Sequence, residues 1–138
     1  MSENDYVLEP IGFLQSSLKE PGDAPRQGYE GAPDAWLEVN ETVAEGLDTI
    51  AVGDDIILIT WLHKAQRDLL KVHPRNDETI PLTGVFATRS PHRPNPLGLH
   101  RVTVLAIDGK RLHVGPIEAI DGTPVVDIKP VLPQSTDA

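Results

Sequence analysis

The sequence predicts a small, mostly β domain with little helix, built as a barrel or a sandwich. Thirteen prolines and eleven glycines interrupt the 138-residue chain every few residues and leave no room for a long helix. Aromatic side chains make up only 4% of the residues, so Val, Ile and Leu must build the core. A composition of 39% hydrophobic and 24% charged residues suits one globular domain spanning residues 1–138.

The first third of the chain alternates between expected strands and turns. Residues 6–16 are expected to form a strand, with Pro10 marking an edge or a bend. Residues 17–33 contain repeated prolines and glycines and are expected to form a long loop, of a length that is often functional. Apolar and polar residues alternate over 35–40, which predicts a strand, and residues 41–46 fit one helical turn.

The middle of the chain is less regular. Residues 56–62 are continuously apolar and rich in β-branched side chains, which predicts a central buried strand. Residues 64–72 are expected to form a short helix that must end before Pro74. Residues 84–88 predict a further short strand, and residues 90–96 a loop that its prolines stiffen.

The last third predicts a hairpin and a final strand. Residues 98–107 read as a long strand, and Asp108-Gly109 is a strong hairpin signal that leads into a partner strand over 110–114. Asp121-Gly122 marks a second turn, which precedes a strand over 125–131. The ordered core is therefore expected over about residues 6–132, with a frayed tail at 133–138.

Composition excludes several kinds of site. The chain has no cysteine, which excludes disulfides, thiolate zinc sites and cysteine nucleophiles. The five histidines form no closely spaced pair, so we expect no metal site. The longest apolar stretch is too short to span a bilayer, and the acidic N-terminus lacks an apolar signal region, so we expect a soluble cytoplasmic protein with no membrane contact.

Charge is unevenly distributed. The net charge is −9, which disfavours nonspecific binding to nucleic acid, yet residues 79–107 contain no acidic residue. This window carries Arg89, Arg93 and Arg101. It is therefore either a chance cluster or a local site for an anionic group.

The segment GVFATRSPHRPNPLGL at 84–99 is the most unusual in the chain. Its three closely spaced prolines fix the backbone, so Arg89, His92 and Arg93 project from a loop that loses little entropy on binding. The competing interpretation is a rigid strand connection with solvated arginines. The other polar groups, at 25–27, 63–64 and 121–124, are weak signals on their own.

Together with Pro25-Arg26-Gln27, Ile11-Gly12-Phe13 and DGTPVVDIKP at 121–130, this motif resembles the TsaA-like, or TrmO, family. The resemblance implies a small β-barrel, not a Rossmann fold, that binds S-adenosyl-L-methionine. It implies a methyltransferase acting on N6 of a threonylcarbamoyl-modified adenosine beside the tRNA anticodon. It also implies a homodimer with the cofactor near the subunit interface.

The resemblance further implies residue roles. The expected cofactor contacts are Pro25, Arg26, Gln27, His63, Lys64, Arg89, Leu99, Asp121, Gly122, Thr123 and Pro124. His92, Arg93 and Asn95 are expected to contact the substrate, and no catalytic residue is assigned. Two departures from the family pattern are Leu97, a conservative change, and His100, which replaces a small polar residue and is expected at the rim of the site.

Two other functions remain open. The acidity of the chain suits a methyltransferase of the same fold whose acceptor is a small molecule. The third possibility is a noncatalytic module that binds S-adenosyl-L-methionine as a sensor or partner surface.

Overall fold

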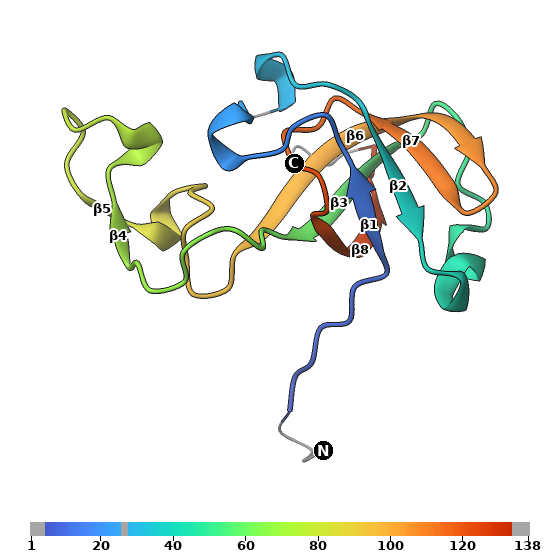
Figure 1. Cartoon of the computed structure of the whole chain (residues 1–138), viewed down its shortest axis with the longest axis horizontal. Coiled ribbons are helices and arrows are strands. Elements are labelled where there is room, and N and C mark those ends of the chain that lie inside the picture. Colours follow the sequence, from blue (N-terminus) through green and yellow to red (C-terminus); the bar gives the residue numbers. More distant parts are fainter. Residues whose placement is uncertain (1–4, 26–27, 134–138) are drawn as a thin grey trace.

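Six antiparallel strands close into a barrel in the computed structural model, which describes residues 5–25 and 28–133 (Figure 1). The mostly β barrel that the sequence and the resemblance predict is confirmed. The barrel strands are β1 (Gly12–Gln15), β2 (Ala35–Val39), β3 (Asp55–Trp61), β6 (Leu97–Asp108), β7 (Arg111–Gly115) and β8 (Pro124–Pro130). A separate two-stranded sheet is formed by β4 (Lys71–Val72) and β5 (Thr83–Gly84).

Helical structure in the described residues is limited to short 3-10 turns. They are η1 (Pro21–Asp23), η2 (Gly28–Glu30), η3 (Glu41–Leu47), η4 (Pro74–Asn76) and η5 (Val85–Ala87). η3 corresponds to the helical turn predicted after the second strand. No helix in this described part of the chain is long and apolar enough to cross a membrane.

Strand order gives the barrel two distinct ends. The order around the barrel is β1-β2-β7-β6-β3-β8, and every neighbouring pair is antiparallel. Therefore β1, β3 and β7 end at the same rim where β2, β6 and β8 begin. The connections at this rim are residues 16–34, 62–96 and 116–123, and we call it the loop end.

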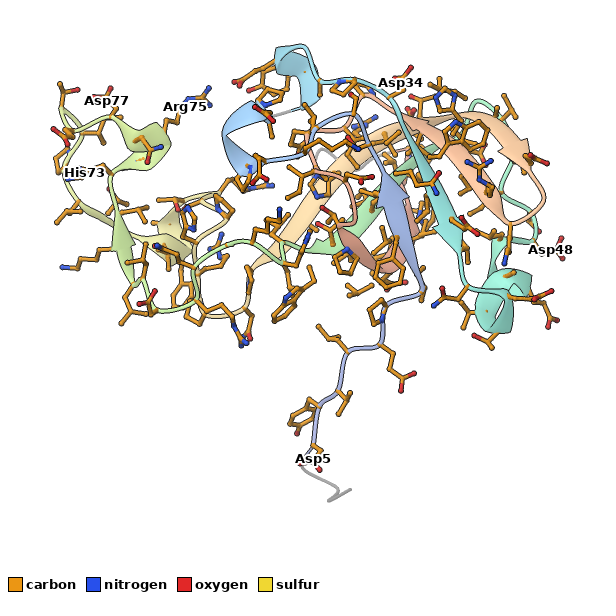
Figure 2. The ribbon with its side chains drawn as sticks, viewed as in Figure 1. Asp5, Asp34, Asp48, His73, Arg75 and Asp77 are labelled. Atoms are coloured by element: carbon orange, nitrogen blue, oxygen red, sulfur yellow. The ribbon has the colours of Figure 1, made fainter. Side chains whose placement is uncertain are left out.

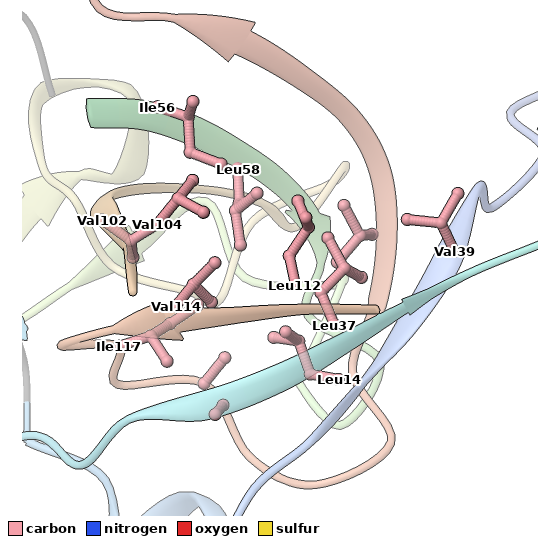
Figure 3. Close-up of a cluster of buried hydrophobic side chains, with 13 residues drawn as sticks. Leu14, Leu37, Val39, Ile56, Leu58, Val102, Val104, Leu112, Val114 and Ile117 are labelled. Atoms are coloured by element: carbon pink, nitrogen blue, oxygen red, sulfur yellow. The ribbon is translucent and has the colours of Figure 1, made fainter. Parts of the chain in front are cut away.

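The core fills the barrel with aliphatic side chains (Figure 3). Leu14, Leu37, Leu58 and Leu112 are all at most 1% exposed. The predicted central buried strand is confirmed as β3, in which buried and half-buried residues alternate. The reason is closure: each barrel strand turns one face to the interior and the other outward.

The first strand is shorter than predicted. It begins at Gly12 instead of residue 6, and the preceding residues run away from the barrel (Figure 1). The chain approaches β2 so closely at Gly12 that an added Cβ would lie 2.3 Å from the Glu38 carbonyl oxygen. Pro10 has no amide hydrogen to donate to a ladder, and Tyr6 is 93% exposed.

The helix predicted over 64–72 is absent, and the strand predicted over 84–88 is reduced to β5 followed by η5. The backbone of Gln66 explains the first difference. Its amide donates to His92 Nδ1 at 3.0 Å, and its carbonyl accepts the Arg93 amide at 3.1 Å. A tertiary contact with the proline-rich loop thus takes the Gln66 carbonyl, which a helix over 64–72 would pair with the amide four residues later.

Candidate functional site

The candidate residues of the sequence analysis gather at the loop end because they occupy its three connections. Pro25 lies in the first connection, His63 and Lys64 begin the second, and Asp121 lies in the third. Leu99 lies near the start of β6, opposite Ile59 of β3. Arg26 and Gln27 lie outside the described residues. Segments that are far apart in sequence therefore share one rim.

The Asp121 carboxylate is anchored to the end of β1. Its Oδ1 accepts the Ser16 amide at 2.9 Å, and its Oδ2 lies 3.3 Å from Lys19 Nζ. The Ser16 hydrogen bond is the main cause that holds the pKa of Asp121 below its ordinary value, with Lys19 adding to it. Asp121 is therefore ionised at neutral pH and held in one place.

The rest of this turn is fixed by backbone contacts with Leu14. The Gly122 amide donates to the Leu14 carbonyl at 2.8 Å, and the Leu14 amide donates to the Thr123 carbonyl at 3.0 Å. Gly122 has a φ of 79°, a conformation that glycine adopts without strain. Thr123 is 1% exposed, and Pro124 begins β8. A ligand can therefore reach only the solvent-facing atoms of residues 121–124.

The first two connections meet through an ion pair. Lys64 Nζ lies 3.6 Å from Glu20 Oε2, on the same connection as the half-buried Pro25. His63 precedes this lysine. Partial desolvation of its ring is the larger cause that lowers the pKa of His63, and the charge of Lys64 is the smaller. The imidazole is therefore uncharged at neutral pH.

The Arg93 side chain holds the proline-rich loop through hydrogen bonds to nearby backbone carbonyls. Its Nη1 donates to the carbonyls of Thr88 at 3.2 Å and Ser90 at 3.1 Å, and its Nη2 donates to the Val85 carbonyl at 2.7 Å. The loop over 88–96 is therefore rigid for a reason beyond its prolines.

His92 and Asn95 also bind neighbouring protein groups. His92 accepts the Gln66 amide, and Asn95 Oδ1 accepts Arg67 Nη2 at 3.4 Å. Arg67 additionally donates from Nε to the Pro94 carbonyl at 2.7 Å. The three side chains that the resemblance assigns to the substrate thus have framework contacts in the structure, and their substrate contact stays a prediction.

Arg89 differs from its neighbours in the same loop. It is exposed, and no hydrogen bond or ion pair joins its side chain to another residue within 5–25 or 28–133. No such contact links it to the other candidate residues either. Leu99 is also accessible, with 44% of its surface exposed on the outer face of β6. Both remain available to a ligand.

Three residues that hold candidate side chains in place were not predicted from the sequence. Ser16, Lys19 and Glu20 lie at the loop end and fix Asp121 or Lys64, yet each is an ordinary polar residue in a glycine- and proline-rich stretch. The unusual length of that stretch was the one signal. His100, expected at the rim, is 5% exposed and lies in the interior.

The clearest surface hollows lie elsewhere. One of about 370 Å³ is lined by residues of η3 and of the β6–β7 turn, and one of about 540 Å³ lies beside it around Lys110. Neither includes a candidate residue. Within the described ranges no three His, Asp or Glu side chains come together as a metal site.

The groups at the loop end suit a small zwitterion with an apolar part. Arg89 offers a guanidinium for a carboxylate, and Asp121 an ionised carboxylate for an ammonium or a hydroxyl. His63 is an uncharged polar neighbour, and Leu99 supplies an apolar surface. Positions held by backbone and ion-pair contacts favour binding because little order is lost.

Known solved structures share this architecture. A crystal structure of TrmO superposes with a TM-score of 0.76 at 34% identity, covering 97% of this chain and 62% of that one. TrmO from Pseudomonas aeruginosa gives a TM-score of 0.72 at 31% identity, covering 97% and 60%. The chain thus spans about three fifths of the solved chains that it matches.

Sequence relatives agree with this result. An S-adenosyl-L-methionine-binding protein of Archaeoglobus fulgidus is 41% identical over 93% of this chain and 91% of its own. A probable S-adenosyl-L-methionine-binding protein of Pyrococcus horikoshii is 45% identical over 96% and 86%. Residues 13–138 match the family described as the tRNA-methyltransferase O N-terminal domain. Since this match covers most of the sequence and the barrel is shared, the chain belongs to that family.

Proposed function

We propose that this protein binds S-adenosyl-L-methionine at the loop end and transfers its methyl group to a nitrogen acceptor. The observation that carries the proposal is topological. Antiparallel closure puts all three connections that hold the predicted cofactor contacts at one rim. The family match and the names of the relatives from Archaeoglobus and Pyrococcus support the choice of ligand.

The residues present fit this cofactor chemically. Arg89 would bind the carboxylate of the methionyl part, and Asp121 its ammonium or a ribose hydroxyl. An uncharged His63 avoids repulsion of the sulfonium, and Leu99 would contact the adenine. Backbone groups of Pro25 and of the 121–124 turn complete the expected contacts.

The bound cofactor supplies an electrophilic methyl group, so the chain needs no covalent nucleophile. Methyl transfer is an in-line displacement whose rate depends chiefly on the placement of the two reacting atoms. The work of the protein is therefore orientation. The rigid loop over 88–96 and the anchored Asp121 turn would both help to hold the cofactor in place for the acceptor nitrogen.

The proposed acceptor is N6 of a threonylcarbamoyl-modified adenosine beside the tRNA anticodon. Purified protein is incubated with labelled S-adenosyl-L-methionine and tRNA that carries the threonylcarbamoyl group but no methyl group. Nucleoside mass spectrometry should find the label on that adenosine. Label in no tRNA nucleoside contradicts the acceptor, and cofactor binding without transfer to any acceptor identifies a noncatalytic module.

A small-molecule acceptor is the second candidate, and one observation favours it. Of the three arginines in the acid-free window, Arg93 binds backbone carbonyls and Arg101 lies 3.6 Å from the Asp55 carboxylate. Among the arginines of this window, all of which the structure describes, Arg89 is left for a phosphate backbone, in a chain of net charge −9. Transfer to free modified nucleoside as fast as to tRNA would identify this alternative.

We also propose that the protein acts as a homodimer in the cytoplasm, where tRNA is modified. Three large apolar side chains are exposed around the β4–β5 sheet: Leu70 at 65%, Leu82 at 59% and Phe86 at 80%. Phe86 lies three residues before Arg89, so a second copy on this surface would come near the cofactor.

A further inference from the structure

Three polar side chains form a continuous hydrogen-bonded chain beneath the loop end. Thr60 and His100 are 0% and 5% exposed. His100 Nε2 lies 2.7 Å from Thr60 Oγ1, and His100 Nδ1 lies 2.6 Å from Glu118 Oε1. The Glu118 side chain is 16% exposed. None of the three is among the predicted cofactor or substrate contacts.

Each member belongs to a different segment that carries candidate contacts. Thr60 in β3 lies three residues before His63, His100 in β6 directly follows Leu99, and Glu118 lies three residues before Asp121. We propose that Thr60, His100 and Glu118 form a positioning network that holds these three segments in the arrangement that binds the cofactor. This inference rests on the proposed function.

The chemistry of the groups fixes the direction of the hydrogen bonds. An ionised Glu118 only accepts, so His100 Nδ1 must carry a hydrogen and donate it. With the hydrogen on Nδ1, Nε2 can accept the hydrogen of the Thr60 hydroxyl, and both ring nitrogens then have a partner. This is the arrangement by which a carboxylate sets the orientation of a histidine.

The neighbouring backbone leaves space for this arrangement. Gly98 lies directly across from Thr60 in the β3–β6 ladder. A Cβ on Gly98 would lie 2.6 Å from Thr60 Oγ1 and 2.7 Å from His100 Nε2, which no stable contact permits. The absence of a side chain at Gly98 therefore leaves the space that the Thr60–His100 hydrogen bond occupies.

Glu118 connects the network to the residues that close the barrel core at the loop end. Its neighbours Ile117 and Ala119 are 0% and 3% exposed and close the core at the loop end. The Ile117 amide donates to the Pro33 carbonyl at 2.9 Å, which joins the first connection to the third. The Ile117 contact holds the chain before Glu118. Without the Glu118–His100 contact, the part of the third connection between Glu118 and Asp121 would lose an anchor.

The test compares Glu118→Ala with Glu118→Gln, which retains an accepting oxygen. Each variant is titrated calorimetrically with S-adenosyl-L-methionine well below its melting temperature. We expect Glu118→Ala to raise the Kd at least about fivefold and Glu118→Gln to stay within about twofold of wild type, because the glutamine variant keeps the hydrogen bond from His100 Nδ1 that the alanine variant loses. Thr103→Val is the matched control. It removes an exposed hydrogen bond between the Thr103 hydroxyl and the Asp55 carboxylate, on the strand β6 that also holds His100, and it should leave the Kd for S-adenosyl-L-methionine unchanged.

Nitrogen spectra of the histidine ring provide a readout that does not depend on the cofactor. The wild type should show a protonated Nδ1 on His100, and Thr60→Val, which preserves side-chain shape, should change the Nε2 resonance. An unprotonated Nδ1, or a Glu118→Ala variant that binds as tightly as wild type, overturns the network. If Glu118→Ala does not fold, the Kd of Thr60→Val decides, and a value equal to wild type overturns the network. No binding by the wild type overturns the proposed function instead, while the ring spectra still report on the hydrogen bonds.

Discussion

Arg89 and Arg93 lie four residues apart in one loop, yet their guanidinium groups have different surroundings. Arg93 donates to three carbonyls of its own loop, whereas Arg89 has no partner among the described residues. The sequence motif presents both as equivalent cations. Only the structure separates the arginine that builds the loop from the one that is available to a ligand.

Replacing Arg89 should therefore weaken cofactor binding without affecting the fold. We expect Arg89→Ala to raise the Kd for S-adenosyl-L-methionine at least about tenfold, equivalent to about 1.4 kcal/mol. Arg89→Lys should recover only part of the loss, because an ammonium lacks the planar fork that binds a carboxylate. Calorimetric titration with a thermal melt as folding control measures both effects, and an unchanged Kd for Arg89→Ala contradicts this role.

The lowered pKa of His63 predicts a pH dependence. Protonation of His63 adds a positive charge near the proposed place of the cofactor's positively charged sulfonium. The affinity for S-adenosyl-L-methionine should therefore fall as the pH drops below the ordinary histidine range. The folded chain binds this proton less readily than the unfolded chain, so acidification also reduces stability. His63→Gln should flatten both curves between pH 7.5 and about 5. Parallel curves for the two proteins would exclude His63 as the titrating group.

At the scale of elements, the Arg93 side chain holds residues 85–93 together through three hydrogen bonds to backbone carbonyls. Hydrogen bonds to charged groups contribute about 1.5–3 kcal/mol each, so Arg93→Ala should lower the free energy of unfolding by about 2–3 kcal/mol or more. Arg101→Ala is the control, because its exposed pair with Asp55 should contribute about 1 kcal/mol or less. Urea unfolding measures both, and equal losses would contradict the framework role of Arg93.

Elements with local signals were predictable from the sequence. The Asp108-Gly109 hairpin and the long strand before it appear within a residue or two of their predicted bounds, because turn chemistry and β-branched runs act locally. The helix over 64–72 failed because its backbone groups bind residues near 92, a contact that no local pattern encodes. The full strand over 6–16 failed because pairing with β8 begins only near Gly12.

The candidate site residues were named on a different basis. Its positions came from a resemblance, and strand order then explains why such scattered positions share a rim. The anchors were not predictable, because Ser16, Glu20 and Glu118 are ordinary residues until the barrel closes. The same applies to His100, whose burial follows from its inward position on β6.

At the scale of the whole molecule, the β4–β5 sheet extends away from the barrel (Figure 1), and Figure 2 shows His73, Arg75 and Asp77 at its outer tip. Arg75 Nη2 lies 2.6 Å from Glu30 Oε1, which connects this tip to η2 of the first connection. This ion pair joins the extension to the first connection, and exposed apolar side chains lie around its sheet.

These exposed side chains predict a homodimer. Light scattering should give twice the 15.0 kDa of one chain, and Phe86→Glu should shift the protein to the monomer, because an unpaired charge is costly at an apolar interface. Leu132→Glu is the control, at a residue that is 62% exposed on the segment after β8. A wild type that remains at 15.0 kDa at micromolar concentration and above contradicts the dimer.

The most direct test of cofactor binding at the loop end is a calorimetric titration of wild type and of Asp121→Ala with S-adenosyl-L-methionine. The wild type should bind saturably with one cofactor per chain. Asp121→Ala should bind at least about tenfold more weakly, a loss of about 1.4 kcal/mol, while its thermal melt stays cooperative. No heat of binding with the wild type, or full affinity in Asp121→Ala, would contradict the placement of the cofactor at this end of the barrel.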